Sequence, residues 1–270
     1  EFHILELVNP VFPLAPKPYV FCSDATILGS PFYVMERKHG VVLDEKFPQG
    51  IEPDPELCRS ISFAVVDTLV ALHEVDYKAA GMAHIGHPEG YLERQVRGWV
   101  GRYERAKTDD IPEMDKVAKW LIEHLPASPA PAIVHNDYKL NNMMLSHDLD
   151  RIVGVFDWEM TTIGDPLADL GAVLTYWTLS TDPEEWRQLR PSVTMTPGFI
   201  SREEFVERYA SKSGRDVSNI NYYWVFGYIK LAGIIQQIYY RWKRGQTRDS
   251  RFANMGKVVR HLINAAADRI

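Results

Sequence analysis

Short apolar runs bounded by turn residues open the chain. The segments 19–24 ("YVFCSD") and 30–37 ("SPFYVMER") have strand character, and Gly29-Ser30 supplies a turn between them. The charged, proline-rich stretch 44–55 comes next and predicts a linker. We therefore expect a small β-containing piece at this end of the protein.

Beyond the linker, apolar residues recur at helical spacing. Asp54 is a good N-cap with Pro55 at the first helical position, and an apolar stripe follows at Leu57, Ile61, Val65, Leu69 and Leu72. Ser201 and Glu204 have the spacing of a capping box. Further helices are expected to begin at Asp165 or to span about 90–106, 113–125, 218–243 and 252–268. The body of the protein is thus predicted to be mainly helical.

One β-hairpin is expected to interrupt that body, over residues 142–159. Two strand-like runs, "MMLS" and "RIVGVFDW", flank the turn-forming "HDLD". If the runs pair, the chain leaves Asn142, travels roughly 15 Å and returns as far. Asp157 then comes back to the end where Asn142 lies, and Asp137 lies just upstream of that end. One amide and two carboxylates are predicted to converge.

This convergence suits a divalent cation together with phosphate. Mg²⁺ prefers oxygen ligands, which Asn142 and Asp157 offer. Asp137 would more naturally orient a hydroxyl that attacks a terminal phosphate, or accept its proton. Lys139 would balance charge on the transferring group, and His135 would hold the loop by hydrogen bonds. Taken singly, each residue has an ordinary structural role, so it is the joint arrangement that indicates phosphoryl transfer.

Composition narrows the class of protein. With 270 residues, 46% of them hydrophobic, the chain is long enough for a substantial core. The formal net charge of -6 argues against general binding to nucleic acid or to an anionic membrane. Cys22 and Cys58 form neither a ligand cluster nor a disulfide framework, which favours a reducing compartment. Because there is no apolar run of roughly 18 residues and no secretory signal, a cytoplasmic protein is expected.

Three motifs give the chain a family resemblance. "HNDYKLNN" (135–142) matches H-x-D-x-x-x-x-N, "VFDWE" (155–159) stands where protein kinases carry D-F-G, and "GDPLADL" (164–170) follows them. With these motifs the chain resembles the kinase-like phosphotransferases, specifically their aminoglycoside phosphotransferase and choline kinase branch.

The resemblance implies an α+β, protein-kinase-like bilobal fold. Residues 1–40 would be the remnant of an incomplete small β lobe with the hinge. Residues 41–270 would be a mainly helical large lobe that carries the catalytic β-hairpin and the acceptor site. It also implies ATP and Mg²⁺ as cofactors.

The same resemblance implies a role for each member of the convergent group. Asp137 would be the catalytic base with Lys139 beside it, and Asn142 and Asp157 would be the magnesium ligands. Among the neighbouring acids, roles are implied less directly: Glu159 is a candidate for the surroundings of the metal, Asp169 would brace the catalytic loop, and Asp165 would either brace that loop or cap a helix.

The start of the chain departs from the family pattern. Met35, Glu36 and Arg37 would line the adenine pocket, and "EFHIL" looks like the helix that supplies the acidic partner of the ATP-positioning lysine, with Glu1 as that acid. The lysine and the phosphate-covering loop would come before Glu1. We therefore expect the sequence to be an N-terminally incomplete piece of a longer kinase, the alternative being a degraded relative.

The acceptor is expected to be a small hydroxylated molecule. The whole-chain pattern, notably 29–43 and 238–252, looks most like the kinase-like domains found alone in bacteria or fused to acyl-CoA dehydrogenases. Those relatives imply a hydroxyacyl-CoA or a related metabolite. The second segment also holds a basic cluster, which would either neutralise an anionic acceptor or form a solvated helix end: Arg241, Lys243, Arg244 and Arg248.

Other functions are alternatives to this one. An aminoglycoside is polycationic and would need an acidic pocket, for which "DPEEW" (182–186) is too slight. A nucleotide-binding pseudoenzyme or scaffold would account for the absent lysine. A metal-dependent hydrolase would need a denser set of ligands. We predict a small-molecule kinase with neither a nucleic-acid nor a membrane partner, and no pattern in the sequence specifies its oligomeric state.

Overall fold

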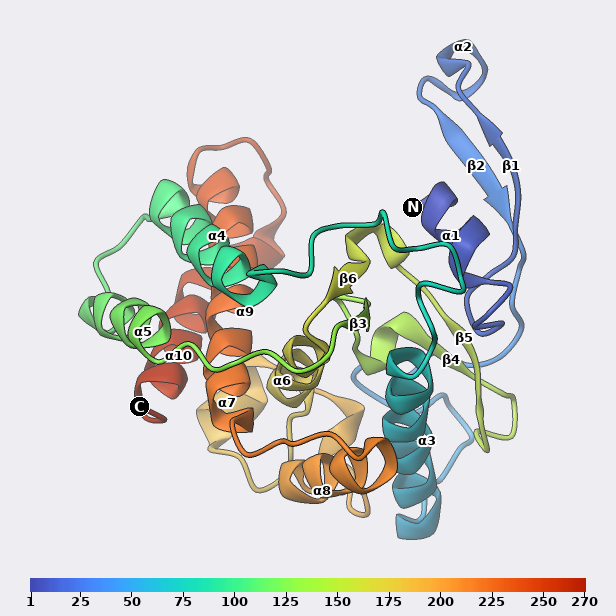
Figure 1. Ribbon diagram of the computed structural model, residues 1–270. Coiled ribbons are helices and arrows are strands. Elements are labelled where there is room, and N and C mark those ends of the chain that lie inside the picture. Colours follow the sequence, from blue (N-terminus) through green and yellow to red (C-terminus); the bar gives the residue numbers. More distant parts are fainter.

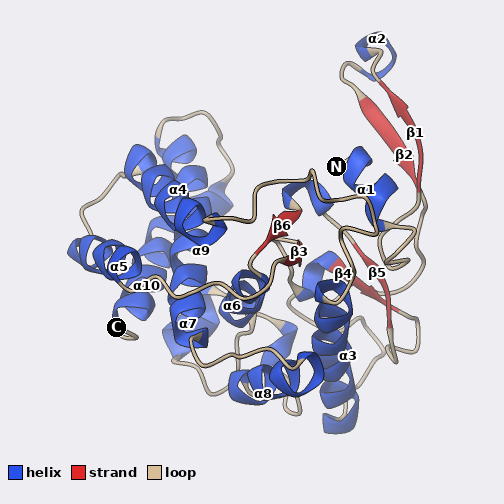
Figure 2. Ribbon diagram, in the orientation of Figure 1, coloured by secondary structure: helices blue, strands red, loops and turns tan.

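The computed structural model describes all of residues 1–270 as ten α-helices and six short β-strands, together with a few turns of 3-10 helix. Figure 1 shows the helices as the larger part of the molecule, with the strands toward one side, and Figure 2 shows the same division by type of element. This mixture agrees with the predicted α+β class. No helix is long and apolar enough to cross a membrane.

The N-terminal strands pair as predicted. β1 (Pro18–Cys22) and β2 (Phe32–Met35) are antiparallel and form a hairpin that projects from the rest of the protein (Figure 1). Between them the chain makes a short helix, α2 (Ala25–Leu28), rather than a simple turn. Asp24 caps this helix, and Gly29 ends it with a φ of 84°, a conformation that glycine adopts at little cost.

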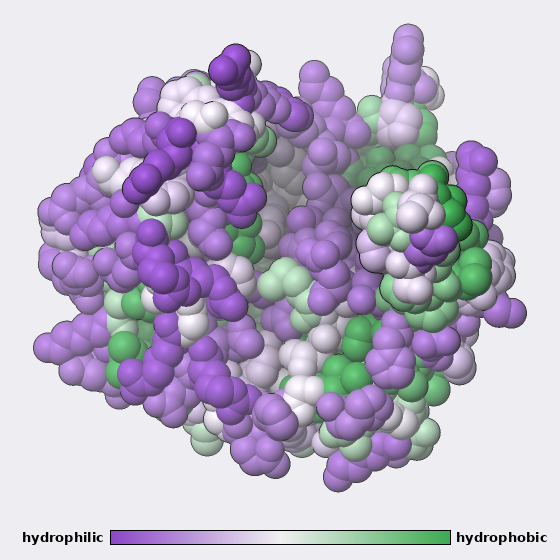
Figure 3. Space-filling model, turned by 90° about the horizontal axis from the view of Figure 1, so that it is seen from above, coloured by the Kyte–Doolittle hydropathy of each residue, from purple (hydrophilic) through white to green (hydrophobic).

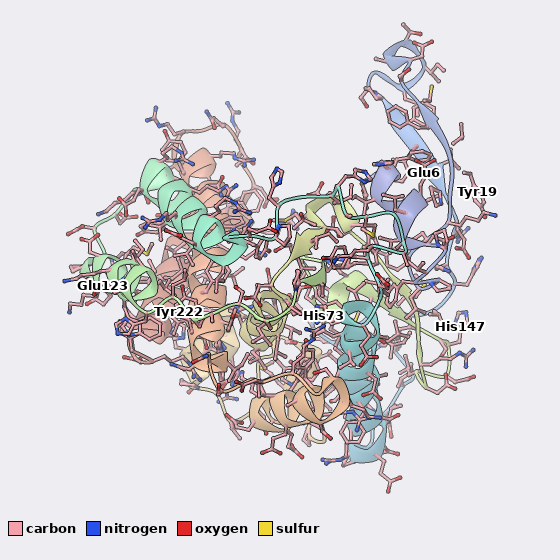
Figure 4. The ribbon with its side chains drawn as sticks, viewed as in Figure 1. Glu6, Tyr19, His73, Glu123, His147 and Tyr222 are labelled. Carbon is pink, nitrogen blue, oxygen red and sulfur yellow. The ribbon has the colours of Figure 1, made fainter.

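The predicted β-hairpin of the body is confirmed. β4 (Met143–Leu145) pairs antiparallel with β5 (Ile152–Val155), and Met143 stands opposite Val155. The turn between the strands lies at the edge of the molecule, where Figure 4 shows His147. The opposite end of the hairpin therefore points into the protein.

A second strand pair, which the sequence did not predict as a pair, encloses this hairpin. β3 (Ala132–Val134) is antiparallel to β6 (Thr162–Gly164), and Val134 stands opposite Thr162. The chain between these two residues therefore starts and ends at the same residue pair of the two-stranded sheet. All of the predicted catalytic residues lie within that excursion.

The remaining helices follow the predicted pattern closely, with local capping as expected. The Asp54 side chain accepts a hydrogen bond of 2.7 Å from the Leu57 N–H, and Ser201 and Glu204 form both bonds of the capping box. Only α7 was not predicted. The bounds are α1 (Phe2–Val8), α3 (Pro55–His73), α4 (Tyr91–Ala106), α5 (Pro112–Glu123), α6 (Pro166–Tyr176), α7 (Glu184–Leu189), α8 (Arg202–Ser213), α9 (Ile220–Lys243) and α10 (Met255–Ala267).

Helix α9 runs through the middle of the helical body and packs against α4, α6 and α10. Its crossing with α6 brings the two backbones very close at a pair of glycines. A Cβ atom on Gly171 of α6 would lie 2.3 Å from the carbonyl oxygen of Tyr223, and one on Gly227 of α9 would lie 2.7 Å from the carbonyl oxygen of Gly171. The absence of side chains at these positions sets the separation of the two helices.

We predict that Gly171→Ala will destabilise the protein, because its methyl group would meet the backbone of α9. The expected loss in the free energy of unfolding, measured in urea, is about 1–3 kcal/mol, the usual cost of overpacking. Gly101→Ala in α4 is the control, since its Cβ would approach only the flexible side chain of Arg105. That variant should be neutral or stabilising by up to about 1 kcal/mol, and equal stabilities of the two variants would contradict the close crossing.

Candidate active site

The inner end of the β4–β5 hairpin brings the predicted amide and carboxylates together. The Phe156 N–H donates to the Asn142 carbonyl at 2.9 Å, which extends the ladder by one step and places Asp157 next to Asn142. The Asn142 side-chain amide donates to Asp137 Oδ2 at 2.8 Å and to the Asp137 carbonyl at 3.0 Å. The predicted convergence is therefore present in the fold.

Negative charge accumulates at this end of the hairpin. Partial burial, together with the charges of Asp137 and Glu159, raises the pKa of the Asp157 carboxyl. Lys139 offsets part of that charge, because its Nζ lies 2.8 Å from Asp137 Oδ2. One lysine faces three carboxylates, so the site favours the arrival of a further cation.

The atoms that this arrangement leaves free are oxygens. Since Asn142 gives its NH₂ group to Asp137, its Oδ1 is the atom available to a ligand. Asp157 is held in its place by the backbone, in a left-handed conformation with a φ of 69°, and burial and like charges rather than hydrogen bonds dominate its pKa. Mg²⁺ takes such oxygens from one or two protein groups and completes its octahedron with water and phosphate. The donor set fits a magnesium ion.

A buried carboxylate on α6 holds the loop before Asp137, as the sequence predicted for Asp169. Its two oxygens accept hydrogen bonds from consecutive backbone N–H groups, Oδ2 from His135 at 2.6 Å and Oδ1 from Asn136 at 2.7 Å. Burial would raise the pKa of Asp169, but the hydrogen bond from His73 and the positive field of Lys230 bring it below its ordinary value. Asp165 caps α6 through the Leu167 N–H at 3.0 Å, one of its two expected roles.

His135 holds the loop by hydrogen bonds, as predicted. Its Nε2 lies 2.9 Å from the Phe156 carbonyl and its Nδ1 lies 3.2 Å from the Asp137 N–H. Burial lowers the pKa of this imidazole. A neutral ring with its proton on Nε2 satisfies both bonds, so His135 ties the residue before Asp157 to the backbone of Asp137.

Lys230, which was not among the residues predicted from the sequence, approaches the same loop from α9. The side chain is buried, and its Nζ donates to the Asn136 carbonyl at 2.5 Å and lies 3.3 Å from Asn136 Oδ1. Asn136 has a left-handed backbone with a φ of 67°, a strained geometry that persists where its surroundings fix it. A lysine in the middle of the apolar run "VFGYIKLAGII" was the signal that could have identified it.

His73, at the end of α3, was also missed. Figure 4 shows it near the centre of the molecule, where its Nε2 lies 3.4 Å from Asp169 Oδ2 and its Nδ1 lies 2.8 Å from the Tyr209 hydroxyl. Burial lowers the pKa of His73. Because nothing in the apolar stripe of α3 distinguishes a partner for α6 from an ordinary buried histidine, this contact had no signal in the sequence.

Glu1 lies beside the inner end of the hairpin. Its Oε1 accepts a hydrogen bond of 3.0 Å from the Trp158 N–H, and its Oε2 accepts one of 2.6 Å from the Tyr33 hydroxyl. The first residue of the chain thus contacts the residue that directly follows Asp157.

The predicted hinge residues lie at the end of β2 and directly after it. Glu36 accepts a hydrogen bond of 3.1 Å from the Lys17 N–H and forms an ion pair of 3.0 Å with Lys38. Met35 ends β2 with its side chain exposed, and Arg37 is exposed as well. Their proposed contact with adenine stays a prediction.

A pocket of about 460 Å³ adjoins the Asp137 group. Lys139 forms part of its wall, together with residues of α6, the segment after α7 and the linker near Asp44. A larger pocket of about 530 Å³ between α9 and α10 contains none of the predicted residues. Seen from above, the surface is also hollowed between the helical part and the β1–β2 hairpin (Figure 3).

We predict that Asp169→Asn will lower the free energy of unfolding by about 3–5 kcal/mol, because one of the two N–H donors would face an NH₂ group. The pKa of Asp169 lies below the ordinary 3.8 in the folded state, so its ionised form stabilises the protein above that pH and loses this effect as the pH falls. The difference between the variant and the wild type, measured by denaturant unfolding, should therefore shrink in acid.

Asp148→Asn is the control for that variant, since Asp148 is exposed on the hairpin turn. It should change stability by less than about 0.5 kcal/mol. A cost of similar size in both variants, or one that is independent of pH for Asp169→Asn, would contradict the role assigned to Asp169.

The sequence profile of the phosphotransferase enzyme family matches residues 1–190. Acyl-CoA dehydrogenase family member 10 from Mus musculus is 31% identical over 271 residues. That match covers 99% of this chain but 25% of the relative, so the chain spans a quarter of the length of that protein.

Two solved structures show the same fold. A crystal structure of a candidate aminoglycoside phosphotransferase from Ralstonia eutropha superposes with a TM-score of 0.86 at 29% identity, and the match covers 99% of this chain and 81% of the other. A thermostable mutant of the aminoglycoside phosphotransferase APH(4)-Ia, in ternary complex with ADP and hygromycin B, has a TM-score of 0.65 at 14% identity over 99% of this chain and 82% of the other. The architecture is that of the protein-kinase-like phosphotransferases.

Proposed function

The chain belongs to the phosphotransferase enzyme family, and on that premise we propose that it transfers the terminal phosphoryl group of ATP to a hydroxyl group of a small molecule, with Mg²⁺. The observation that carries this proposal is the group at the inner end of the hairpin. There Asn142 donates to Asp137, Lys139 is paired with Asp137, and Asp157 follows the residue bonded to Asn142.

In this proposal each side chain of the group has a defined role. Asp137 orients the acceptor hydroxyl and takes its proton as the oxygen attacks phosphorus. Lys139 stabilises negative charge on the transferring group, for which its ion pair with Asp137 places it within reach. Asn142 both fixes the Asp137 carboxylate through its NH₂ group and presents Oδ1 on its other side.

Asp157 and Asn142 would hold Mg²⁺ by one carboxylate and one amide oxygen. Bound there, the ion would neutralise charge on the phosphates of the nucleotide. The raised pKa of Asp157 in a site crowded with carboxylates supports this assignment, because an uncompensated cluster of negative charge is stabilised by a divalent cation.

For the nucleotide, we propose that residues 1–40 form a small lobe with the hinge and that residues 41–270 form the catalytic lobe. Met35, Glu36 and Arg37 would line the adenine pocket, and Glu1 would be the acid that pairs with an ATP-positioning lysine. The contact of Glu1 with the Trp158 N–H supports that role, and the structural relative that holds ADP supports a nucleotide of this class.

For the acceptor, we propose a hydroxyacyl-CoA or a related metabolite, since a relative is named as an acyl-CoA dehydrogenase family member. The basic cluster predicted for this purpose is divided in the fold. Lys243 is paired with Asp109 at 3.2 Å and Arg244 lies over Tyr240. Arg248 is exposed. Arg241 lines a pocket of about 300 Å³ with Arg102 and Arg105, and these three arginines would bind the phosphates of such an acceptor.

We predict that Asp137→Ala will reduce turnover of ATP by about 100-fold or more, because positioned general-base catalysis typically contributes that much. The measurement is ADP formation together with the gain of one phosphate in mass, over a pool of hydroxylated metabolites. It should use the protein with any residues that precede Glu1 in its natural sequence. Asp148→Ala, in the exposed turn of the same hairpin, should turn over ATP as the wild type does.

Turnover that survives in Asp137→Ala would overturn the catalytic assignment. Turnover that does not depend on Mg²⁺, or that Asp157→Ala leaves unchanged, would overturn the metal assignment. Phosphorylation of cationic sugars, with none of acyl-CoAs, would favour an antibiotic kinase over the proposed acceptor.

A further inference from the structure

Arg190, directly after α7, carries a charge that the protein does not neutralise. Arg190 is one of the residues that line the pocket of about 460 Å³ to which Lys139 also belongs. One hydrogen bond is formed, from Nη1 to the Thr175 carbonyl at 2.6 Å, although a guanidinium has five N–H donors. Burial lowers the pKa of Arg190 to about 10, so it stays charged near neutral pH.

Two aromatic rings fix the plane of this guanidinium. It lies 5.3 Å from the centroid of the Tyr176 ring and 4.9 Å from that of Trp186. Such stacking holds the donors in place without satisfying them. The free N–H groups are therefore fixed in position rather than mobile at the surface.

The same tyrosine connects Arg190 to the catalytic group. Lys139 Nζ lies 5.4 Å from the Tyr176 ring centroid and also 2.8 Å from Asp137 Oδ2. Asp137 is near enough to Tyr176 that its charge helps to raise the pKa of that phenol, after the larger effect of burial. Arg190 and Lys139 thus lie against the same tyrosine ring, which places Arg190 near the proposed site of phosphoryl transfer.

The nearby acids are already engaged or lie at the mouth of the pocket. Asp182 is bound by both terminal nitrogens of Arg202, at 2.7 and 2.5 Å. Asp44 accepts a hydrogen bond of 3.2 Å from Asn141, and Asp44 and Glu45 are both exposed. None of these carboxylates forms an ion pair with Arg190, which leaves a half-buried cation in the pocket wall without a carboxylate partner. A ligand that carries an anion would supply that partner.

We propose that Arg190 recognises a carboxylate or phosphate carried by the acceptor molecule, and so holds the acceptor with its hydroxyl at Asp137. This rests on the proposed function, because it names the chemical class of the molecule that the phosphoryl group would reach. The short separation through Tyr176 favours an acceptor in which a short spacer joins the hydroxyl to the anion. Of the acceptors proposed above, this selects a small related metabolite rather than a hydroxyacyl-CoA, whose phosphates lie far from its acyl chain. A polycationic acceptor is disfavoured by the same charge.

A purely structural role for Arg190 makes a different prediction. Its bond to the Thr175 carbonyl satisfies an acceptor in the last turn of α6, and loss of that bond alone would lower stability without selecting among ligands. Binding of matched small molecules separates the two roles. It also needs no phosphoryl transfer, so its result stands whether or not the chain turns over ATP.

The test is isothermal titration, without ATP or Mg²⁺, of four compounds that differ in charge: 5-hydroxypentanoate, glycerol 3-phosphate, pentane-1,5-diol and 5-aminopentan-1-ol. At least one anion should bind the wild type about tenfold or more tightly than the diol and the amine. Arg190→Gln should weaken binding of that anion by about 10- to 100-fold, which is the contribution of hydrogen bonds to a charged group. It should leave the affinity for the diol unchanged. Arg190→Lys should restore part of the loss.

Arg187→Gln is the matched control. Arg187 lies on α7 and, like Arg190, donates to a backbone carbonyl, that of Asp182 at 3.0 Å, so its loss removes a comparable structural bond. It should leave all four affinities as in the wild type. In turnover assays with an anionic acceptor, Arg190→Gln should raise KM for the acceptor and leave KM for ATP unchanged.

Three results would each overturn the proposal: equal wild-type affinities for anions and the diol, preference for the amine, or an Arg190→Gln variant that binds the anion as the wild type does. If Arg190→Gln fails to fold, the discrimination by the wild type among the four compounds decides. The better of the two anions identifies whether a carboxylate or a phosphate is the natural partner.

Discussion

The candidate site depends on one residue, Asn136, whose backbone is held from both sides by buried charges. Asp169 of α6 accepts the N–H of Asn136, and Lys230 of α9 donates to its carbonyl. An anion and a cation, both removed from water, thus fix a residue whose left-handed backbone would otherwise be unfavourable. Asp137 follows immediately, so its position is set by these two side chains more than by anything within its own loop.

The two charges can both reach Asn136 because their helices cross at close range. Asp169 lies two residues before Gly171 on α6, and Lys230 lies three residues after Gly227 on α9. Since both glycines let the backbones touch, the crossing fixes how far apart the anion and the cation stand. The geometry of the loop consequently depends on the packing of the two helices. A methyl group at the crossing would disturb both.

How much of the fold and of the candidate site the sequence predicted depended on how far apart along the chain the interacting residues are. The β4–β5 hairpin, the caps at Asp54 and Ser201 and the convergence on Asn142 follow from patterns a few residues long. The pairing of β3 with β6, and the approach of Lys230 to Asn136, join segments up to about a hundred residues apart, and three-residue strands carry little periodic signal. The role proposed for Arg190 could not be predicted for the same reason, because the absence of an ion-pair partner depends on which residues surround it in the folded protein.

The pairing of Val134 with Thr162 has a consequence for how the acceptor specificity of such a protein can evolve. Residues 135–161 form a loop that begins and ends at this one strand pair. Arg190 and the helix before it, α7, lie outside that loop. The residues proposed to handle phosphate and the arginine proposed to hold the acceptor therefore lie on separate segments of the chain. Substitutions outside residues 135–161 could therefore change which acceptor is bound while the residues proposed for phosphoryl transfer stay the same.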